Sequence, residues 1–228
     1  MKSLFVSVAL FTCIVAVGQK ADSSKAQLNI FTLGDSNGTF LYSWPKQLQL
    51  ALPDAQVFNI SKSGRTIGFV NNGDSTLNSL LVIDENLRKA ADFIKENVFN
   101  FIVLDLGTND AKAVFADRQK EVAGNLNKLI QKIKYSEYAS ISKASIIIIA
   151  PTPFGEKAEA TEKYKGAGKR VEKMSKAFKK IAKRNHCIFV NGFKTPGLDI
   201  NTMTADGIHL NAEASAKLIA PVVAIIRQ

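Results

Sequence analysis

Five short apolar stretches alternate with longer stretches of helical periodicity, and this alternation constrains the fold more than any other feature of the chain. The strand-like stretches are residues 27–33, 55–60, 101–106, 144–150 and 187–190. The helix-like stretches are residues 44–52, 77–97, 117–138, 161–184 and 211–226. Residues 101–106 and 144–150 are continuously apolar, which is typical of strands that helices cover on both faces of a parallel sheet. The alternation therefore predicts βαβ units and a three-layer sandwich.

Right-handed crossovers between such strands predict one parallel sheet with the strand order 2-1-3-4-5. We therefore expect an α/β fold, with helices on both faces of five parallel strands. Residues 77–97 are predicted to be helical in two pieces, and residues 61–78, 151–157 and 192–206 are predicted to be irregular loops. A chain of 228 residues is long enough for one such domain and does not need a second.

The N-terminal segment differs in character from the rest of the chain. A positive charge at Lys2 precedes an apolar run, residues 4–17, and the run ends in small residues up to Gly18. We expect residues 1–18 to be a secretory signal peptide, residues 19–228 to form the single domain, and the mature protein to be periplasmic or secreted from a bacterium. An uncleaved anchor is the less favoured alternative, because the apolar run is short for a bilayer span. Stable membrane insertion is therefore not expected.

The cysteine content limits the covalent and metal sites that the chain can form. Cleavage after Gly18 removes Cys13 and leaves Cys187 as the only mature cysteine, which excludes an intrachain disulfide. Lipid attachment at Cys13 is disfavoured, because the bulkier Phe11 and Thr12 precede it. One cysteine and two separated histidines also argue against a zinc site, and no metal is expected.

Four short polar motifs occur in a fixed order along the chain. They are Gly34-Asp35-Ser36, a Ser-Gly-Arg turn at Gly64, Gly107-Thr108-Asn109-Asp110, and Asp206-Gly207-Ile208-His209. The first three motifs follow the first three predicted strands, at the carboxyl edge of the sheet, where open parallel sheets form their sites. We therefore expect residues that are far apart in sequence to meet at this edge.

Ser36, His209 and Asp206 are the candidates for nucleophile, base and base-orienting carboxylate in acyl transfer. Ser36 follows a strand and a glycine, a position at which a lone serine is more often a helix cap. Asp206 lies three residues before His209, so a tight turn would place its carboxylate against the imidazole and fix the tautomer. Alternatively, His209 is a surface histidine that precedes the last helix. The four motifs together favour the catalytic reading.

Three groups are candidates for an oxyanion hole: the N–H of Ser36, the N–H of Gly64 and the side-chain amide of Asn109. A glycine at position 64 leaves room for the substrate, and each donor would stabilise developing negative charge. The alternative for Gly64 and Asn109 is ordinary turn chemistry, since both residue types are common in turns. Asp35 and Asp110 are expected to hold their loops through backbone hydrogen bonds.

Two common nucleotide and hydrolase signatures are absent from the sequence. There is no Gly-x-Ser-x-Gly elbow, which argues against the usual α/β-hydrolase arrangement, and no Gly-x-x-x-x-Gly-Lys phosphate loop. The four motifs instead resemble those of the SGNH hydrolases, also called the GDSL esterase/lipase family, over residues 34–209.

The resemblance implies a flavodoxin-like fold, no cofactor, a triad of Ser36, Asp206 and His209, and an oxyanion hole formed by Ser36, Gly64 and Asn109. Residues 59–66 and 106–112 are similar to the arylesterase and acetylesterase branch of the family. One departure from the family pattern is Asn37, which stands where the family name has leucine. Because this position flanks the nucleophile, the departure bears on the lining of the pocket.

These features predict a serine carboxylic-ester hydrolase that acts through an acyl-enzyme on small-molecule or polysaccharide esters, with acetyl as the first expected acyl group. One alternative is a lysophospholipase or thioesterase that accepts longer acyl chains. A second alternative is a non-catalytic protein that binds anionic glycans.

The net charge of +10 concentrates in residues 161–184, whose apolar residues recur at helical spacing. A solvated face that aids solubility is the favoured interpretation. The alternative is contact with an anionic polymer or a lipid headgroup surface. Nucleic acid is not expected as a partner, because no recognition motif accompanies the charge.

Overall fold

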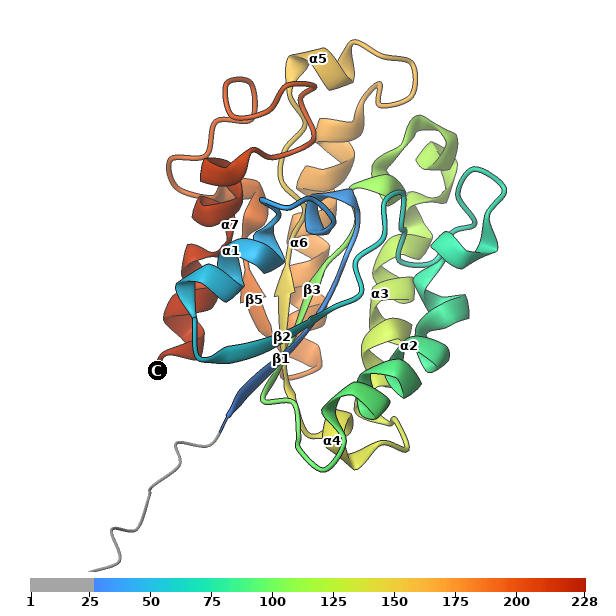
Figure 1. Cartoon of the computed structure of the whole chain (residues 1–228). Helices are drawn as coiled ribbons and strands as arrows, with labels where there is room; N and C mark the ends of the chain where they lie inside the picture. The colour runs from blue at the N-terminus through green and yellow to red at the C-terminus, as the bar shows by residue number, and fades with distance from the viewer. Residues whose placement is uncertain (1–26) are drawn as a thin grey trace, which may run out of the picture.

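The computed structural model describes residues 27–228 and consists of helices packed on both faces of one parallel sheet (Figure 1). The strands are β1 (Leu28–Gly34), β2 (Ala55–Asn59), β3 (Phe101–Asp105), β4 (Ser145–Ile149) and β5 (Ile188–Val190). All neighbouring strands pair in parallel, in the order β2-β1-β3-β4-β5. The predicted fold class and strand order are confirmed. The expected signal peptide, residues 1–18, lies outside the described residues.

Each face of the sheet has its own helices. Helices α1 (Trp44–Ala51) and α7 (Ala212–Ile226) pack on one face. Helices α2 (Ser79–Ile94), α3 (Gln119–Lys134) and α6 (Ala167–Arg184) pack on the other face, and the short helices α4 (Ala139–Ser142) and α5 (Glu156–Glu159) lie in connections. Figure 1 shows α1 and α7 on the opposite side of the strands from α2 and α3.

Strand β4 explains why both faces are covered. Ile146 and Ile148 belong to the core under α2, α3 and α6, whereas Ile147 and Ile149 belong to the core under α1 and α7. Successive side chains of a strand point to opposite faces, so a run of isoleucines requires an apolar layer on each side. Each buried isoleucine contributes roughly 1.5–3 kcal/mol relative to leaving its side chain exposed.

Several predicted helix boundaries are wrong. Helix α2 is one helix and not two, because Asn78 caps its start by accepting the N–H of Leu80, while Lys95 ends it with a φ of +52°. Helix α3 begins after a 3-10 helix, Ala113–Arg118, and ends at Lys134, so it is shorter than residues 117–138. Residues 161–184 are helical only from Ala167 onward, and residues 151–157 include the start of α5.

Between residues 27 and 228, no helix combines the length and the apolar character that a bilayer crossing requires. Cys187, the cysteine in this part of the chain, is a free thiol.

Candidate active site

The polar motifs meet at the carboxyl edge of the sheet. Strand β1 ends at Gly34, and a 3-10 helix, Ser36–Gly38, follows at once. Asp35 caps this turn, because its Oδ1 accepts the N–H of Asn37 at 3.0 Å. The short turn holds Ser36 directly beyond the strand end.

Ser36, His209 and Asp206 form a continuous line of hydrogen bonds, although 173 positions separate the serine from the histidine. Nε2 of His209 lies 2.9 Å from Oγ of Ser36, and Nδ1 of His209 lies 2.5 Å from Oδ2 of Asp206. The side chain of His209 is 35% exposed and that of Asp206 is 48% exposed, so both are partly open to solvent. The imidazole is placed to take a proton from Ser36 while the carboxylate sets its tautomer.

The turn from Asp206 to His209 is built by the aspartate itself. Oδ1 of Asp206 accepts the N–H groups of Ile208 at 2.9 Å and His209 at 2.8 Å. Gly207 has a φ of +81°, which favours glycine there, and its N–H donates to Oγ1 of Thr204 at 2.8 Å. Partial burial acts to raise the pKa of Asp206, but the hydrogen bonds from His209 and Ile208 outweigh it and lower that pKa. Asp206 is therefore ionised at neutral pH.

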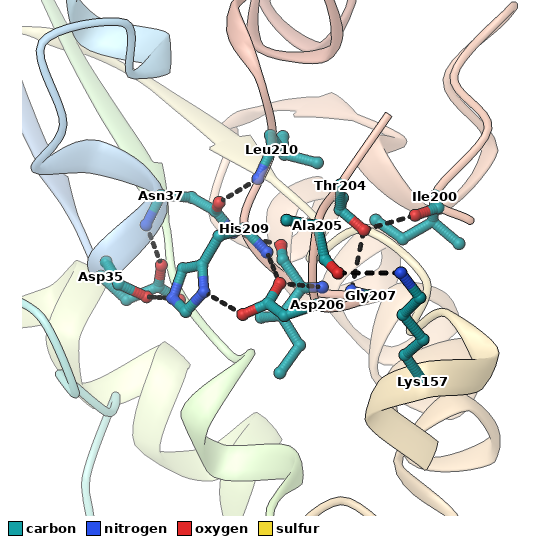
Figure 2. A network of polar contacts seen from close by, with 12 residues as sticks. Asp35, Asn37, Lys157, Ile200, Thr204, Ala205, Asp206, Gly207, His209 and Leu210 are labelled. Atoms are coloured by element: carbon teal, nitrogen blue, oxygen red, sulfur yellow. Dashed lines mark hydrogen bonds and ion pairs between the residues drawn. The ribbon is translucent and has the colours of Figure 1, made fainter. Parts of the chain in front are cut away.

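Asn37 connects the serine segment to the histidine segment. Its buried side chain accepts the N–H of Leu210 at 3.0 Å and donates to the carbonyl of Ile208 at 3.3 Å. Figure 2 shows Asn37 reaching Leu210 and His209 reaching Asp206. The two bonds hold the backbone on either side of His209, a role that leucine at this position would be unable to fill.

The three candidate oxyanion donors are all at this edge. Within residues 27–228, the N–H groups of Ser36 and Gly64 donate no hydrogen bond to the protein. Gly64 has a φ of +82°, and Nδ2 of Asn109 donates to the carbonyl of Arg65 at 3.1 Å. That bond uses one amide hydrogen of Asn109 and leaves the second one available.

Asp35 and Asp110 bond backbone N–H groups of the loops around the site. Asp35 accepts from Asn37, and the two oxygens of Asp110 lie 3.0 and 3.1 Å from the N–H of Ile67. Burial raises the pKa of Asp110 to about 7. Burial also raises the pKa of Asp105 well above its usual value, and the nearby carboxylate of Asp35 adds to that shift. In the described part of the chain, no three His, Cys, Asp or Glu side chains are grouped as metal ligands.

Arg65 and Thr66, which follow Gly64 in the sequence, both brace the loop. Arg65 is buried and donates to the carbonyl of Ile60 at 2.5 Å, and its burial lowers its pKa to about 10. Oγ1 of Thr66 donates to the carbonyl of Phe69 at 2.6 Å. Neither side chain lines an open surface.

Sequence reasoning missed two groups of residues near the site. One is a buried pair, Lys112 and Asn71, whose side chains bond each other at 2.9 Å. The other is aromatic: Phe40 packs edge-on against the ring of His209 and stacks on Tyr42. The available signals were a lysine two positions after the motif that ends at Asp110 and an aromatic pair four and six positions after Ser36.

The sequence model of the GDSL-like lipase/acylhydrolase family matches residues 30–217. No curated protein sequence matches the chain significantly. Among solved structures, a carbohydrate acetylesterase from Sinorhizobium meliloti aligns with a TM-score of 0.74 and 19% identity, over 88% of this chain and 99% of that one. The native aryl esterase of M. smegmatis aligns with a TM-score of 0.74 and 19% identity, over 88% and 98%. At these identities, the two likenesses establish a shared fold.

Proposed function

The chain belongs to the GDSL-like lipase/acylhydrolase family and is an ester-hydrolysing enzyme, and from this premise we propose its mechanism and substrate class. In this proposal the protein is a serine carboxylic-ester hydrolase that forms a covalent acyl-enzyme. It removes small acyl groups, with acetyl preferred, from carbohydrate or similar esters. The observation that carries the mechanism is the line of hydrogen bonds from Ser36 through His209 to Asp206.

In the first half of the reaction, Oγ of Ser36 attacks the ester carbonyl while Nε2 of His209 accepts its proton. Asp206 stabilises the imidazolium that forms. The carbonyl oxygen becomes an oxyanion, which the N–H groups of Ser36 and Gly64 and the amide of Asn109 bind. Collapse of the intermediate breaks the bond to the alcohol oxygen, and His209 returns its proton to that leaving oxygen.

In the second half, water takes the place of the alcohol. His209 removes a proton from the water as it attacks the acyl carbonyl, and the same donors bind the second oxyanion. The bond to Oγ of Ser36 then breaks, the serine regains its proton from His209, and the carboxylic acid leaves. The enzyme ends the cycle in its starting protonation state.

The aromatic pair beside His209 supports a ring-shaped alcohol group. The leaving oxygen must lie close to Nε2 of His209, so the rest of the alcohol lies near Phe40, whose ring centroid is 5.5 Å from that of His209. Phe40 stacks on Tyr42 at 5.4 Å, and Leu41 between them is 92% exposed. Such an apolar surface suits the face of a sugar or aryl ring.

Hydrolysis of 4-nitrophenyl acetate by the purified protein tests the mechanism, with Ser36→Ala and His209→Ala as the variants. We expect near-background rates in both, and mass spectrometry of the quenched wild-type reaction should show one acetyl group on Ser36. Variants that retain the wild-type rate would refute the triad. Asp199→Asn, which alters an exposed aspartate, should hydrolyse the ester normally.

A series of 4-nitrophenyl esters from acetyl to octanoyl tests the acyl preference. We expect kcat/KM to fall with chain length. A maximum at octanoyl would instead favour the lysophospholipase or thioesterase alternative. Phe40→Ala should raise KM for acetylated sugars more than for ethyl acetate, and Val114→Ala, an exposed apolar residue elsewhere, should change neither.

We also propose that the basic surface of α6 contacts anionic polymers. Lys169, Lys173 and Lys180 are exposed on this helix. Arg170 is less suitable as a contact, because its Nε donates to the carbonyl of Ala111 at 2.7 Å. Replacing the three lysines by glutamate should abolish retention on a polyanionic glycan column and leave 4-nitrophenyl acetate hydrolysis unchanged. Unchanged retention would remove this proposal and would also weaken the glycan-binding alternative.

Periplasmic or secreted location remains a proposal that rests on residues 1–18. Expression of the full chain in a bacterium, followed by fractionation and N-terminal sequencing, tests it. We expect a mature protein outside the cytoplasm that begins near Gln19. A full-length protein in the cytoplasm would contradict it.

A further inference from the structure

Lys112 is buried next to the active site, and the mechanism described above does not use it. Its side chain is 3% exposed, an uncommon environment for a lysine, and its Nζ donates to Oδ1 of Asn71 at 2.9 Å. Burying an ammonium group is unfavourable unless its hydrogen bonds are satisfied. The hydrogen bond to Asn71 therefore compensates in part for the burial of this ammonium group.

Asn71 passes the contact on to Gly64. The asparagine is 1% exposed, and its Nδ2 donates to the carbonyl oxygen of Gly64 at 2.6 Å. On the other side of the same peptide group, the N–H of Arg65 donates to the carbonyl of Lys62 at 3.1 Å. The peptide group between Gly64 and Arg65 is thus held at both its oxygen and its nitrogen. These two hydrogen bonds fix the position of Gly64, whose own N–H donates no hydrogen bond within residues 27–228.

The neighbours of Lys112 in sequence hold the same loop. Asn109 donates to the carbonyl of Arg65, and Asp110 accepts the N–H of Ile67. Together with the contact through Asn71, three side chains of one short segment bind consecutive parts of the loop that carries Gly64. Residues 109–112 therefore fix the backbone of that loop.

The charge on Lys112 is sensitive to pH. Burial lowers its pKa to about 8, with a smaller contribution in the same direction from Lys163, while Asp110 and Asp35 act to raise the pKa. A charged donor forms a stronger hydrogen bond than a neutral amine. The link from Lys112 to Asn71 is therefore expected to weaken as pH rises through this region.

We propose that Lys112 is a positioning residue for transition-state stabilisation, acting through Asn71 to hold Gly64 where its N–H meets the oxyanion. This inference rests on the proposed function, because it needs Gly64 to be an oxyanion donor. Misplacing such a donor by about 1 Å costs on the order of 100-fold in rate. An interaction made only in the transition state lowers kcat and leaves KM nearly unchanged.

Two variants test the link from Lys112 through Asn71 to Gly64, one at each end. Lys112→Met removes the ammonium and keeps most of the side-chain volume. Asn71→Asp keeps an acceptor for Lys112 but loses the donor to Gly64, so it also tests the link if Lys112→Met fails to fold. Lys128→Met, which makes the same substitution at an exposed position of α3, is the control.

Rates with 4-nitrophenyl acetate are expressed per active site, counted by titration with a serine-reactive phosphonate, so that misfolded protein does not contribute. We expect kcat to fall about 10- to 100-fold in both variants with little change in KM. The double variant should be no slower than the slower single variant, because both substitutions break one link. We expect the wild-type kcat to decline as pH rises through about 8, because the link weakens when Lys112 loses its charge, and we expect this decline to be absent in Lys112→Met.

A wild-type kcat per titrated site in either folded variant would overturn the proposal, as would additive losses in the double variant. Failure of the proposed function gives a different result. In that case Ser36→Ala would hydrolyse the ester as fast as the wild type, whatever the Lys112 variants do.

Discussion

The side chain of Asn37 accepts a hydrogen bond from the backbone N–H of Leu210 at 3.0 Å, and thereby joins the residue after the candidate nucleophile to the residue after the candidate base. The same amide donates to the carbonyl of Ile208. His209 is therefore held by its neighbours as well as by Asp206. The position at which this chain departs from the family name contributes directly to the geometry of the triad.

Asn37→Leu should lower kcat/KM about 10-fold or more, because His209 loses the clamp on both sides of its backbone. It should also lower the unfolding free energy by about 1–3 kcal/mol, since the buried N–H of Leu210 is left without its acceptor. Steady-state kinetics and urea unfolding measure the two effects. Asn97→Leu, at an exposed position, is the control. Full activity in Asn37→Leu would show that the turn of Asp206 alone positions the imidazole.

Asp206→Asn should lower kcat at least ~100-fold. Its oxygen can still accept the backbone N–H groups, but its amide would face Nδ1 of His209 and favour the wrong tautomer. Asp199→Asn is a matched control, because Oδ1 of Asp199 also accepts a backbone N–H two residues ahead, at 3.0 Å. A loss of less than tenfold in Asp206→Asn would remove Asp206 from the mechanism.

Gly64→Ala should reduce both stability and kcat. Alanine is strained at a φ of +82°, and its Cβ would lie 3.2 Å from Cδ1 of Leu77. Gly73→Ala imposes a similar strain at +74° with no atom within 4 Å of the added Cβ, so it reports the backbone effect alone. Each should lose about 1 kcal/mol or more of unfolding free energy, and only Gly64→Ala should lose kcat. Equal kinetics in the two variants would argue against Gly64 as an oxyanion donor.

The buried carboxyl of Asp105 should make stability fall as pH rises. Its pKa is raised in the folded protein, so its contribution is fully present below its unfolded pKa and is lost as pH rises through the folded pKa. The pKa of Asp110 is about 7 in the folded protein, so this group also lowers the unfolding free energy as pH rises from about 4 to 7. Each proton contributes a slope of up to about 1.4 kcal/mol per pH unit.

Asp105→Asn isolates one of these groups. The difference in unfolding free energy between this variant and the wild type should shift in favour of the variant as pH rises from about 4 to 8. Denaturant titrations at several pH values measure it. Asp54→Asn, which removes an exposed carboxyl, is the control. A difference that stays constant with pH would mean that Asp105 does not titrate differently in the two states.

The sheet was predictable from the sequence because its signals are local. The isoleucines of β4 require burial on both faces, and right-handed crossovers between alternating strands and helices leave few usual strand orders, of which 2-1-3-4-5 is one. Helix ends were less predictable, because they depend on single side chains and backbone angles. Asn78 caps α2 at a point inside the expected helix, and Gly166 delays the start of α6 with a φ of +72°.

Within the candidate site, sequence order alone was enough to nominate Ser36, Asp206 and His209. The contacts that hold these residues were not predictable, because they join segments far apart in the chain. The bond from Asn37 to Leu210 spans 173 positions, and the bond from Lys112 to Asn71 spans 41. Asn37 and Lys112 lie beside motif residues in the sequence, but no local pattern indicates the distant residues that they contact.

Because Ser36 and His209 lie near opposite ends of the domain sequence, ester hydrolysis can begin only when the last part of the chain has folded. Ser36 follows the first strand, whereas His209 precedes α7, which must pack against α1 before the triad is complete. An intermediate in which the first four strands have formed would already present the hydroxyl, yet it would lack a base and leave esters intact. The time at which esterase activity appears during refolding would therefore report when α7 packs against α1.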